Sequence, residues 1–275
     1  MTGNPVTGDP VTGGGVIRVL APAKLTVSLQ VTGVREDGYH ELEAEMVTLD
    51  LADELQIDED GSDLIVEVEP GVAAVGLPGP GQNLVERALE ACGRRAGVRL
   101  TKRIPLGGGL GGGSADAAAV LRWAGCTDAT VAVRLGADVP FCLAGGRARV
   151  QGVGELVTAL PFAPREFLLL LPPFGVETAE VYRAWDADPG HEGPNALTAA
   201  ALAVEPRLAR WRDALRDLSG SEPVLAGSGS TWFVETDSEG AGAGARSTAK
   251  HDVRVGAETA RLVRARTVPA GWEGD

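Results

Sequence analysis

The order of apolar and polar positions divides the chain into a longer series of strands and helices followed by a shorter one. In the first series, apolar runs or alternating positions predict strands at 16–20, 25–31, 43–51, 64–68, 98–104 and 147–150. Helical spacing predicts helices from Leu84 to about Gly97, from Ser114 or Asp116 to Gly125, and over 127–135. Ala21-Pro22-Ala23 separates the first two strands, 35–38 reads as a turn, and 136–140 interrupts the pattern.

The second series predicts a strand at 166–171, helices at 178–185, 195–202 and 207–218, and a Gly-Ser turn at 227–230 between two apolar stretches. Residues 1–15 repeat Val-Thr-Gly among Gly and Pro and predict a disordered tail, and the Gly, Ala and Ser of 237–249 predict a flexible insert. We therefore expect an N-terminal domain over 16–162 and a C-terminal domain over 163–275. Because strands precede helices without strict alternation, the order indicates an α+β fold rather than a doubly wound sheet.

Composition and charge narrow the class of protein. Hydrophobic residues are 44% of the 275 residues and charged residues 23%, which is ordinary for a soluble protein, while aromatic residues are only 4%, so the core must be mostly aliphatic. The net charge of −13 argues against a nucleic-acid partner, and no apolar run approaches the roughly 20 residues that span a bilayer. Cys92, Cys126 and Cys142 lack metal-ligand spacing and fit a reducing cytosol. We expect a cytoplasmic monomer or weak homodimer.

The most informative segment is a glycine run. Six of the seven residues from Gly107 to Gly113 are glycine, and an alanine-rich helix pattern follows at once. Glycine permits positive φ and leaves amides uncovered, and a helix start adds unpaired N–H groups and partial positive charge, so the segment predicts a cradle for a polyphosphate.

Three interpretations of this run compete. A flexible linker is disfavoured because the run lies between a strand pattern and a strong helix former. Gly107, Gly109 and Gly112 satisfy a dinucleotide-binding G-x-G-x-x-G, but Pro105 breaks the approach, and Asp138 lies in a loop rather than at a clear strand end. No G-x-x-x-x-G-K-[ST] is present, which excludes the P-loop class and leaves a kinase phosphate loop without that lysine.

Four further segments carry a resemblance. They are Ala21-Pro22-Ala23-Lys24-Leu25-Thr26, Asp37-Gly38-Tyr39-His40-Glu41-Leu42, Gly136-Ala137-Asp138-Val139-Pro140-Phe141 and Gly227-Ser228-Gly229-Ser230-Thr231. In this order, with residues 105–118, they resemble the GHMP kinase superfamily. The segment 37–42 resembles the branch that phosphorylates a cytidine-diphosphate-linked sugar alcohol. The resemblance implies a two-domain GHMP kinase fold, with an N-terminal ribosomal-protein-S5-like α/β domain, a C-terminal ferredoxin-like α+β domain and an active site between them.

The resemblance also implies site residues. The catalytic positions are Lys24 and Asp138. The nucleotide positions are Pro105, Leu106, Gly107, Gly108, Gly109, Leu110, Gly111, Gly112, Gly113, Ser114, Ala115, Asn83 and Lys102. The substrate positions are Thr26, Tyr39, His40, Tyr182, Gly227 and Ser228. ATP and Mg²⁺ are the implied cofactors, a small cytidyl-sugar-alcohol is the implied partner, and no residue is expected to be a dedicated metal ligand.

Chemistry supports these roles but leaves alternatives. Asp138 would take or orient the proton of the attacking hydroxyl, and Lys24 would stabilise charge on the transferring phosphate. Taken alone, Lys24 is an exposed strand lysine, Asp138 a turn or cap residue, and His40 a surface hairpin histidine. Asp116 is either an N-terminal helix carboxylate or a water-mediated Mg²⁺ contact. Residues 227–230 either bring amides to the phosphates or only connect two strands.

The chain departs from the family pattern in four places. Thr26 stands where an asparagine is usual, Ala115 replaces the second serine of Ser-Ser-Asp, and Asn195-Ala196-Leu197 replaces Asn-Asp-Leu. The segment between Trp123 and Gly136 is also shorter than usual by roughly seven residues. A GHMP-type kinase for homoserine, mevalonate or a sugar, and a catalytically weak nucleotide-binding homologue, therefore stay as alternatives; a nicotinamide-dependent oxidoreductase is more distant.

Overall fold

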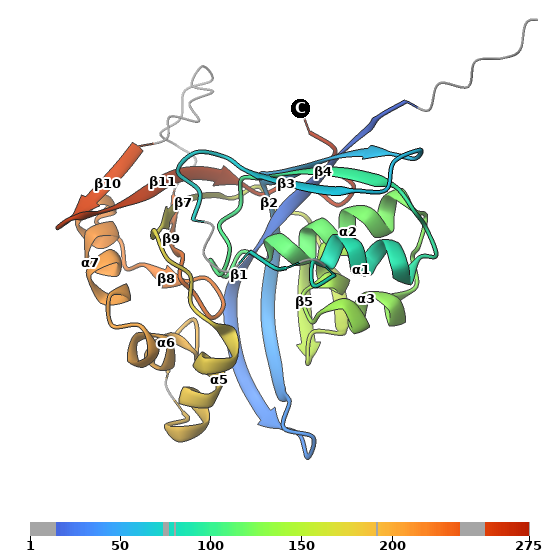
Figure 1. Cartoon of the computed structure of the whole chain (residues 1–275). Coiled ribbons are helices and arrows are strands. Elements are labelled where there is room, and N and C mark those ends of the chain that lie inside the picture. The colour runs from blue at the N-terminus through green and yellow to red at the C-terminus, as the bar shows by residue number, and fades with distance from the viewer. Residues whose placement is uncertain (1–14, 74–76, 80, 191, 237–250, 275) are drawn as a thin grey trace, which may run out of the picture.

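The structure is a computed structural model that describes residues 15–73, 77–79, 81–190, 192–236 and 251–274. The predicted tail, except Gly15, and the predicted insert at 237–249 lie outside these residues. Within them the order of elements is α+β, as expected from the sequence, with two sheets that each carry helices (Figure 1).

The first sheet has the strand order β3 (Leu64–Val68), β4 (Gly97–Lys102), β2 (His40–Asp58), β5 (Arg147–Gly152) and β6 (Leu156–Leu160). β1 (Ile17–Val34) pairs antiparallel with β2 along nearly its whole length. Four helices belong to this half of the molecule: α1 (Leu84–Ala91), α2 (Gly112–Trp123), α3 (Ala129–Leu135) and α4 (Val139–Ala144).

β1 corrects one prediction. We expected two strands separated by Ala21-Pro22-Ala23, but the strand is continuous, with a register shift between Pro22 and Lys24. Proline is tolerated because β2 is the one described strand that pairs with β1, so the other edge of β1 at Pro22 does not require the missing N–H. A proline in a strand pattern therefore marks an edge and a bulge here, not an end.

Glycines account for the helix boundaries. α1 begins after Asn83, whose side chain accepts a hydrogen bond from the Val85 amide at 2.9 Å, as predicted. It ends at Ala91 rather than near Gly97, because Gly93 adopts a φ of 61°. α2 begins at Gly112, earlier than Ser114 or Asp116, with Gly111 as its N-cap, and Gly125 follows its end as predicted.

α4 was not predicted, because Pro140 was read as an interruption. Pro140 lies in the first turn of this helix, where the missing N–H removes no intrahelical bond. β6 was also missed; three of its five residues are exposed and the other two half-buried, and its sequence shows little alternation of apolar and polar positions.

The second sheet is antiparallel, in the order β10 (His251–Val255), β11 (Glu258–Arg266), β7 (Glu166–Leu171), β9 (Trp232–Thr236) and β8 (Val224–Leu225). Its helices are α5 (Thr178–Ala187), α6 (Thr198–Val204) and α7 (Leu208–Ser219). The sequence patterns predicted β7 and these helices but neither β10 nor β11. The domain boundary proposed at 162/163 falls between β6 and β7.

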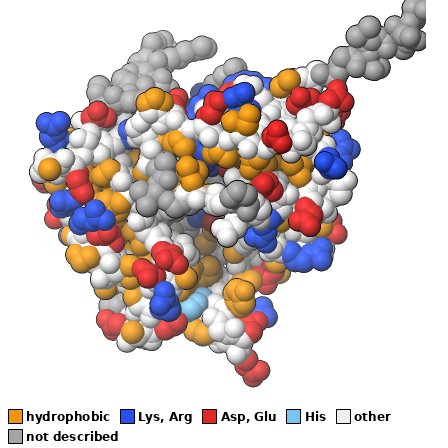
Figure 2. Space-filling model, viewed as in Figure 1, with side chains coloured by type: hydrophobic (Ala, Val, Ile, Leu, Met, Phe, Trp, Pro, Cys, Tyr) orange, Lys and Arg blue, Asp and Glu red, His pale blue; other side chains and the backbone are white. Residues whose placement is uncertain are grey.

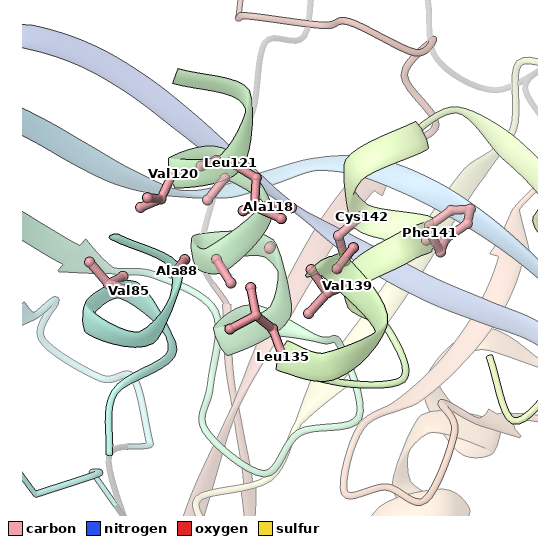
Figure 3. Close-up of a cluster of buried hydrophobic side chains, with 14 of the residues drawn as sticks. Val85, Ala88, Ala118, Val120, Leu121, Leu135, Val139, Phe141 and Cys142 are labelled. Carbon is pink, nitrogen blue, oxygen red and sulfur yellow. The ribbon is translucent and has the colours of Figure 1, made fainter. Parts of the chain in front are cut away.

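Three apolar clusters hold the fold together. The first joins the first sheet to α1–α4 and includes Val85, Leu121, Leu135 and Phe141 (Figure 3). The second joins the second sheet to α5–α7 around Trp211 and Trp232. The third lies between the sheets, where Leu25 and Leu49 meet Phe167 and Phe233. Both halves therefore pack on the β1–β2 hairpin.

The surface carries both signs of charge. Figure 2 shows acidic and basic side chains interspersed over one face, without a broad basic region there. Among the described residues, no helix is both long enough and apolar enough to cross a membrane.

Candidate active site

Lys24 and Asp138 meet at the edge of the first sheet. The Lys24 ammonium lies 3.3 Å from Oδ2 of Asp138, with the lysine side chain 6% exposed and the aspartate side chain 32% exposed. Lys24 is therefore not an exposed strand lysine. The structure brings this pair together as the sequence motifs led us to expect, and it leaves the carboxylate open to solvent on one side.

The backbone fixes both groups. Lys24 donates its amide to the carbonyl of Leu110 at 3.0 Å, and its ammonium donates to Oγ1 of Thr26 at 3.0 Å. Asp138 occupies the N-cap position of α4, but its side chain makes no capping hydrogen bond. The carboxylate thus holds a cap position without serving as the cap, and it remains available for other chemistry.

The glycine run presents a row of unused donors. Its carbonyls are occupied: Gly107 accepts from Val176 and Ser230, Gly108 from Thr231, and Leu110 from Lys24. Within the part of the chain that the structure describes, the amides of 107–114 donate no hydrogen bond. They lead into the N-terminus of α2, so they form the kind of concentrated donor site that binds an anion.

Packing explains some of these glycines and not others. A Cβ on Gly109, whose φ is 74°, would lie 2.0 Å from the carbonyl oxygen of Ala226, and one on Gly111 would lie 2.7 Å from Cγ of Lys24. A Cβ on Gly113 would meet only Cδ1 of Leu84 at 3.5 Å, an ordinary contact. Gly109 and Gly111 are therefore required by the protein itself, whereas the exposed Gly113 leaves room for something outside it.

Lys102 lies in a buried charge cluster. Its ammonium donates to Asp53 and, at 2.6 Å, to Oδ2 of Asp116, and all three residues are almost fully buried. Asp53 also accepts from the amides of Arg103 and Ile104, so the cluster links the end of β4 to α2 on either side of the glycine run. Burial, reinforced by Asp53, raises the pKa of Asp116 to about 7 despite the nearby ammonium.

This cluster bears on two residues singled out from the sequence and adds a third. Lys102 was expected beside the nucleotide; its ammonium has two carboxylate partners and lies 3.2 Å from where a Cβ on Gly112 would be, so it adjoins the glycine run. Asp116 is a buried ion-pair partner rather than a plain helix-terminal carboxylate. Asp53 was missed; the available signal was a pair of charged residues, Asp53 and Glu54, within the otherwise largely apolar segment 51–57. Asn83, also expected beside the nucleotide, uses its side chain to cap α1.

A second group of side chains lies at the start of β2 and on α5. The His40 ring lies 4.6 Å from the ring of Tyr182 and 5.5 Å, edge-on, from that of Trp185. Nε2 of His40 is 2.6 Å from Oδ1 of Asp186. Burial, reinforced by the negative charge of Asp138, raises the pKa of Tyr182, so this ring lies within electrostatic reach of Asp138.

Sequence reasoning found only part of this cluster. His40 and Tyr182 meet as expected, but Tyr39 is 63% exposed and makes no ring contact among the described residues. Trp185 and Asp186 were missed. Helical spacing was the available signal for Trp185, because it lies three positions after Tyr182 on α5.

The turn at 227–230 connects β8 and β9 and also approaches the site. Ser228 shares a hydrogen bond with Thr178 at 2.9 Å, and a Cβ on Gly227 would lie 3.4 Å from the Lys24 ammonium. Asn195 fixes the turn by donating to the carbonyls of Leu225 and Gly227. The segment therefore joins two strands and also borders Lys24; that its amides approach the phosphates stays a prediction.

The described residues contain no group of three or more His, Cys, Asp or Glu side chains arranged to hold a metal ion. Asp138 is the partly exposed carboxylate beside the open amides.

Comparison with known proteins places this geometry in a family. The family described as GHMP kinases N terminal domain matches residues 83–146. A 4-diphosphocytidyl-2-C-methyl-D-erythritol kinase of Paracoccus denitrificans is 38% identical, over 78% of this chain and 85% of its own length. One of Ruegeria pomeroyi is 36% identical, over 87% of this chain and 95% of its own length.

Solved structures agree with the fold. A crystal structure of a 4-(cytidine 5'-diphospho)-2C-methyl-D-erythritol kinase superposes with a TM-score of 0.63 at 37% identity, covering 79% of this chain and 89% of that one. A homoserine kinase from Cytophaga hutchinsonii superposes with a TM-score of 0.56 at 18% identity, over 85% of this chain and 88% of that one. The second likeness concerns the fold alone, and both confirm the GHMP kinase architecture.

Proposed function

The chain belongs to the 4-diphosphocytidyl-2-C-methyl-D-erythritol kinase family of GHMP kinases, and we propose that it transfers the γ-phosphate of ATP to the 2-hydroxyl of 4-diphosphocytidyl-2-C-methyl-D-erythritol. This is a step of the non-mevalonate route to isoprenoid precursors. Family membership confirms the superfamily resemblance drawn from the sequence motifs. The roles of Lys24, Asp138 and residues 107–114 in this reaction are proposed from their positions in the site.

One observation carries the proposal: an ammonium and a carboxylate 3.3 Å apart beside a row of unused backbone donors. The amides of 107–114 would bind the phosphates of ATP. Asp138 would accept the proton of the attacking hydroxyl, because its carboxylate is partly exposed and uncommitted to capping. Lys24, held by Thr26 and the Leu110 carbonyl, would stabilise charge on the transferring phosphate.

Mg²⁺ fits this site as an ion carried mainly by the nucleotide. Mg²⁺ prefers oxygen ligands and usually keeps several waters, with one or two carboxylates and substrate phosphates completing its shell. Asp138 is the partly exposed carboxylate that could join such a shell. Asp116 could not, because its side chain is buried and its Oδ2 is paired with the Lys102 ammonium. The ion would supply additional charge neutralisation for the phosphates.

The aromatic cluster is proposed to hold the cytosine ring of the substrate. Tyr182 and His40 offer ring faces, and His40 is kept in place by Asp186. A cytosine has both a π face for stacking and an edge for hydrogen bonding, and the cluster offers partners for both. Its position near Asp138 puts the cytidyl end on the acceptor side of the site.

The departures from the family pattern leave the proposed chemistry in place. Thr26 keeps a side-chain oxygen that holds the Lys24 ammonium, so the loss of an amide does not release the lysine. Ala115 is buried within α2, where its methyl packs in the first cluster. Neither change removes a group to which the transfer step is assigned, which favours an active kinase over a weak homologue.

The test is transfer of labelled phosphate from ATP to the cytidyl substrate by the purified full chain. We expect Asp138→Asn to lower kcat by about 10²–10⁴-fold with the fold intact. Asp128→Asn is the matched control, because Asp128 caps α3 and asparagine caps a helix equally well. A D138N protein that keeps more than a tenth of the wild-type kcat would remove Asp138 from the mechanism, and failure of the wild type to phosphorylate this substrate would overturn the proposed reaction.

A further inference from the structure

Arg261 on β11 is a buried arginine, and two of its guanidinium nitrogens lack a hydrogen-bond partner among the described residues. The residue is 7% exposed, and its Nε and Nη1 atoms are buried without a hydrogen bond. Its neighbours on the strand are conventional: Ala260 packs in the second cluster and Val263 against the third. A guanidinium in this position calls for an explanation, because buried charges in proteins are nearly always paired.

The carboxylates that act on Arg261 do not supply the missing hydrogen bonds. Glu69 and Asp252 attract the guanidinium electrostatically, but neither accepts a hydrogen bond from Nε or Nη1. Burial outweighs both attractions and lowers the pKa of Arg261. The surroundings therefore hold the charge without neutralising it at close range.

Two cavities border this side chain. The smaller, about 270 Å³, lies between residues 71–73, residues 171–173 and Pro105. The larger, about 540 Å³, lies between β1, β2 and β11 and is lined by the charged residues Arg18, Arg103, Arg264, Asp50, Glu69 and Glu273. A water occupies about 30 Å³ in the liquid, so either space can hold a small anion with its remaining hydration shell.

The lining of the larger cavity contains more arginine than carboxylate side chains. Arg18 and Arg103 both donate to a single carboxylate, that of Glu54, which lies outside the lining. Arg103 reaches Glu69 only at 3.9 Å. Asp50 is engaged by Arg266 at 3.1 Å. Glu273 at the rim is exposed and opposes an anion there, so the favourable position is deeper, against Arg261.

We propose that Arg261 anchors a second anion site, separate from the glycine run, that takes the phosphate or carboxylate group of a small soluble compound. A guanidinium presents planar donors that match the spacing of both oxyanions. The smaller cavity reaches Pro105, the residue that precedes the glycine run, and Ala73 on its wall accepts the amide of Leu106. Arg261 therefore borders both the larger cavity, which would hold the anion, and the smaller cavity, which reaches the residue before the glycine run.

The test is thermal unfolding of the full chain at saturating non-hydrolysable ATP analogue, which keeps the glycine run occupied. Sodium phosphate, sodium acetate and sodium chloride are compared at equal ionic strength. With phosphate or acetate at about ten times its dissociation constant, we expect Tm to rise by about 3–6 °C above the chloride value. A rise with phosphate alone identifies a phosphate group as the ligand, and a rise with acetate alone identifies a carboxylate.

Two variants make the test specific. In Arg261→Met the anion-dependent rise should disappear, while Tm in chloride stays equal to or above the wild-type value because an unpaired buried charge is gone. Arg254→Gln is the matched control: Arg254 is an exposed arginine of the same hairpin, outside both cavities, and should keep the full rise. No rise in the wild type, or an equal rise in R261M, would overturn the proposal.

Discussion

Gly109 and Gly113 lie in the same loop but need to be glycine for different reasons: Gly109 because the protein packs against it, and Gly113 because a bound phosphate would. Substituting each by alanine therefore tests the site directly. In Gly109→Ala the new Cβ would lie 2.0 Å from the Ala226 oxygen and 2.9 Å from that of Gly229, both backbone atoms of the second half. An L-residue at a φ of 74° adds strain. Left-handed conformation costs about 1–2 kcal/mol and overpacking about 1–3 kcal/mol, so we expect a loss of about 2–5 kcal/mol in unfolding free energy.

Gly113→Ala should behave in the opposite way. Its Cβ meets only Leu84 at 3.5 Å, and the position is helical, so the unfolding free energy should stay level or rise by up to about 1 kcal/mol. The added methyl would nevertheless stand beside an amide assigned to ATP. We expect the KM for ATP to rise about tenfold or more with an unchanged Tm.

The assays are thermal unfolding and initial-rate kinetics at varied ATP on the same preparations. For G109A a loss of this size corresponds to a fall in Tm of at least about 4 °C. An unchanged Tm in G109A would refute the contact between loop and turn on which the geometry depends. An unchanged KM for ATP in G113A would refute the assignment of these amides to the phosphates.

Two further predictions concern the buried charge cluster and the aromatic cluster. Burial raises the pKa of Asp116 in the folded protein to about 7, so the folded state binds a proton there more tightly than the unfolded state does. This proton binding stabilises the fold fully below about pH 4, and the stabilisation is lost as the pH rises to 7. Asp116→Asn imitates the protonated acid, so denaturant unfolding at pH 5 and pH 8 should show a smaller decrease in D116N than in the wild type, and equal decreases would contradict the assignment. His40→Ala should raise the KM for the cytidyl substrate about tenfold and leave that for ATP unchanged, because His40 contacts Tyr182 and Trp185 rather than the glycine run. A larger effect on the KM for ATP, measured in the same initial-rate assay, would place His40 elsewhere in the mechanism.

Local signals in the sequence were sufficient where one residue determines one boundary. Asn83 caps α1, Gly125 follows the end of α2, and β3 and β7 have the bounds that their apolar patterns predicted. Pro22 and Pro140 misled, because the effect of a proline depends on whether the N–H that it lacks would have had a hydrogen-bond partner at that position. An edge strand and a first helical turn both remove that requirement, and neither is visible from neighbouring residues.

The site shows the same division. The sequence motifs predicted that Lys24 and Asp138 lie in the same site, and in the structure the Lys24 ammonium is 3.3 Å from the Asp138 carboxylate. The partners of Lys102 could not be predicted, since Asp53 is close only because β2 and β4 pair at Glu54 and Thr101. The packing role of Gly109 also required the second half of the molecule, because its nearest atom belongs to Ala226.

The β1–β2 hairpin limits how this molecule can move. Leu29 contributes to the cluster of the second sheet, Leu25 to the one between the sheets, and Ala21 to that of the first. Backbone bonds also tie Leu29 to residues 194 and 196, and Thr48 to residues 146 and 268. The two halves therefore cannot separate as rigid bodies without breaking these contacts and hydrogen bonds. Lys24, on the same hairpin, is thereby held in a fixed position relative to both halves.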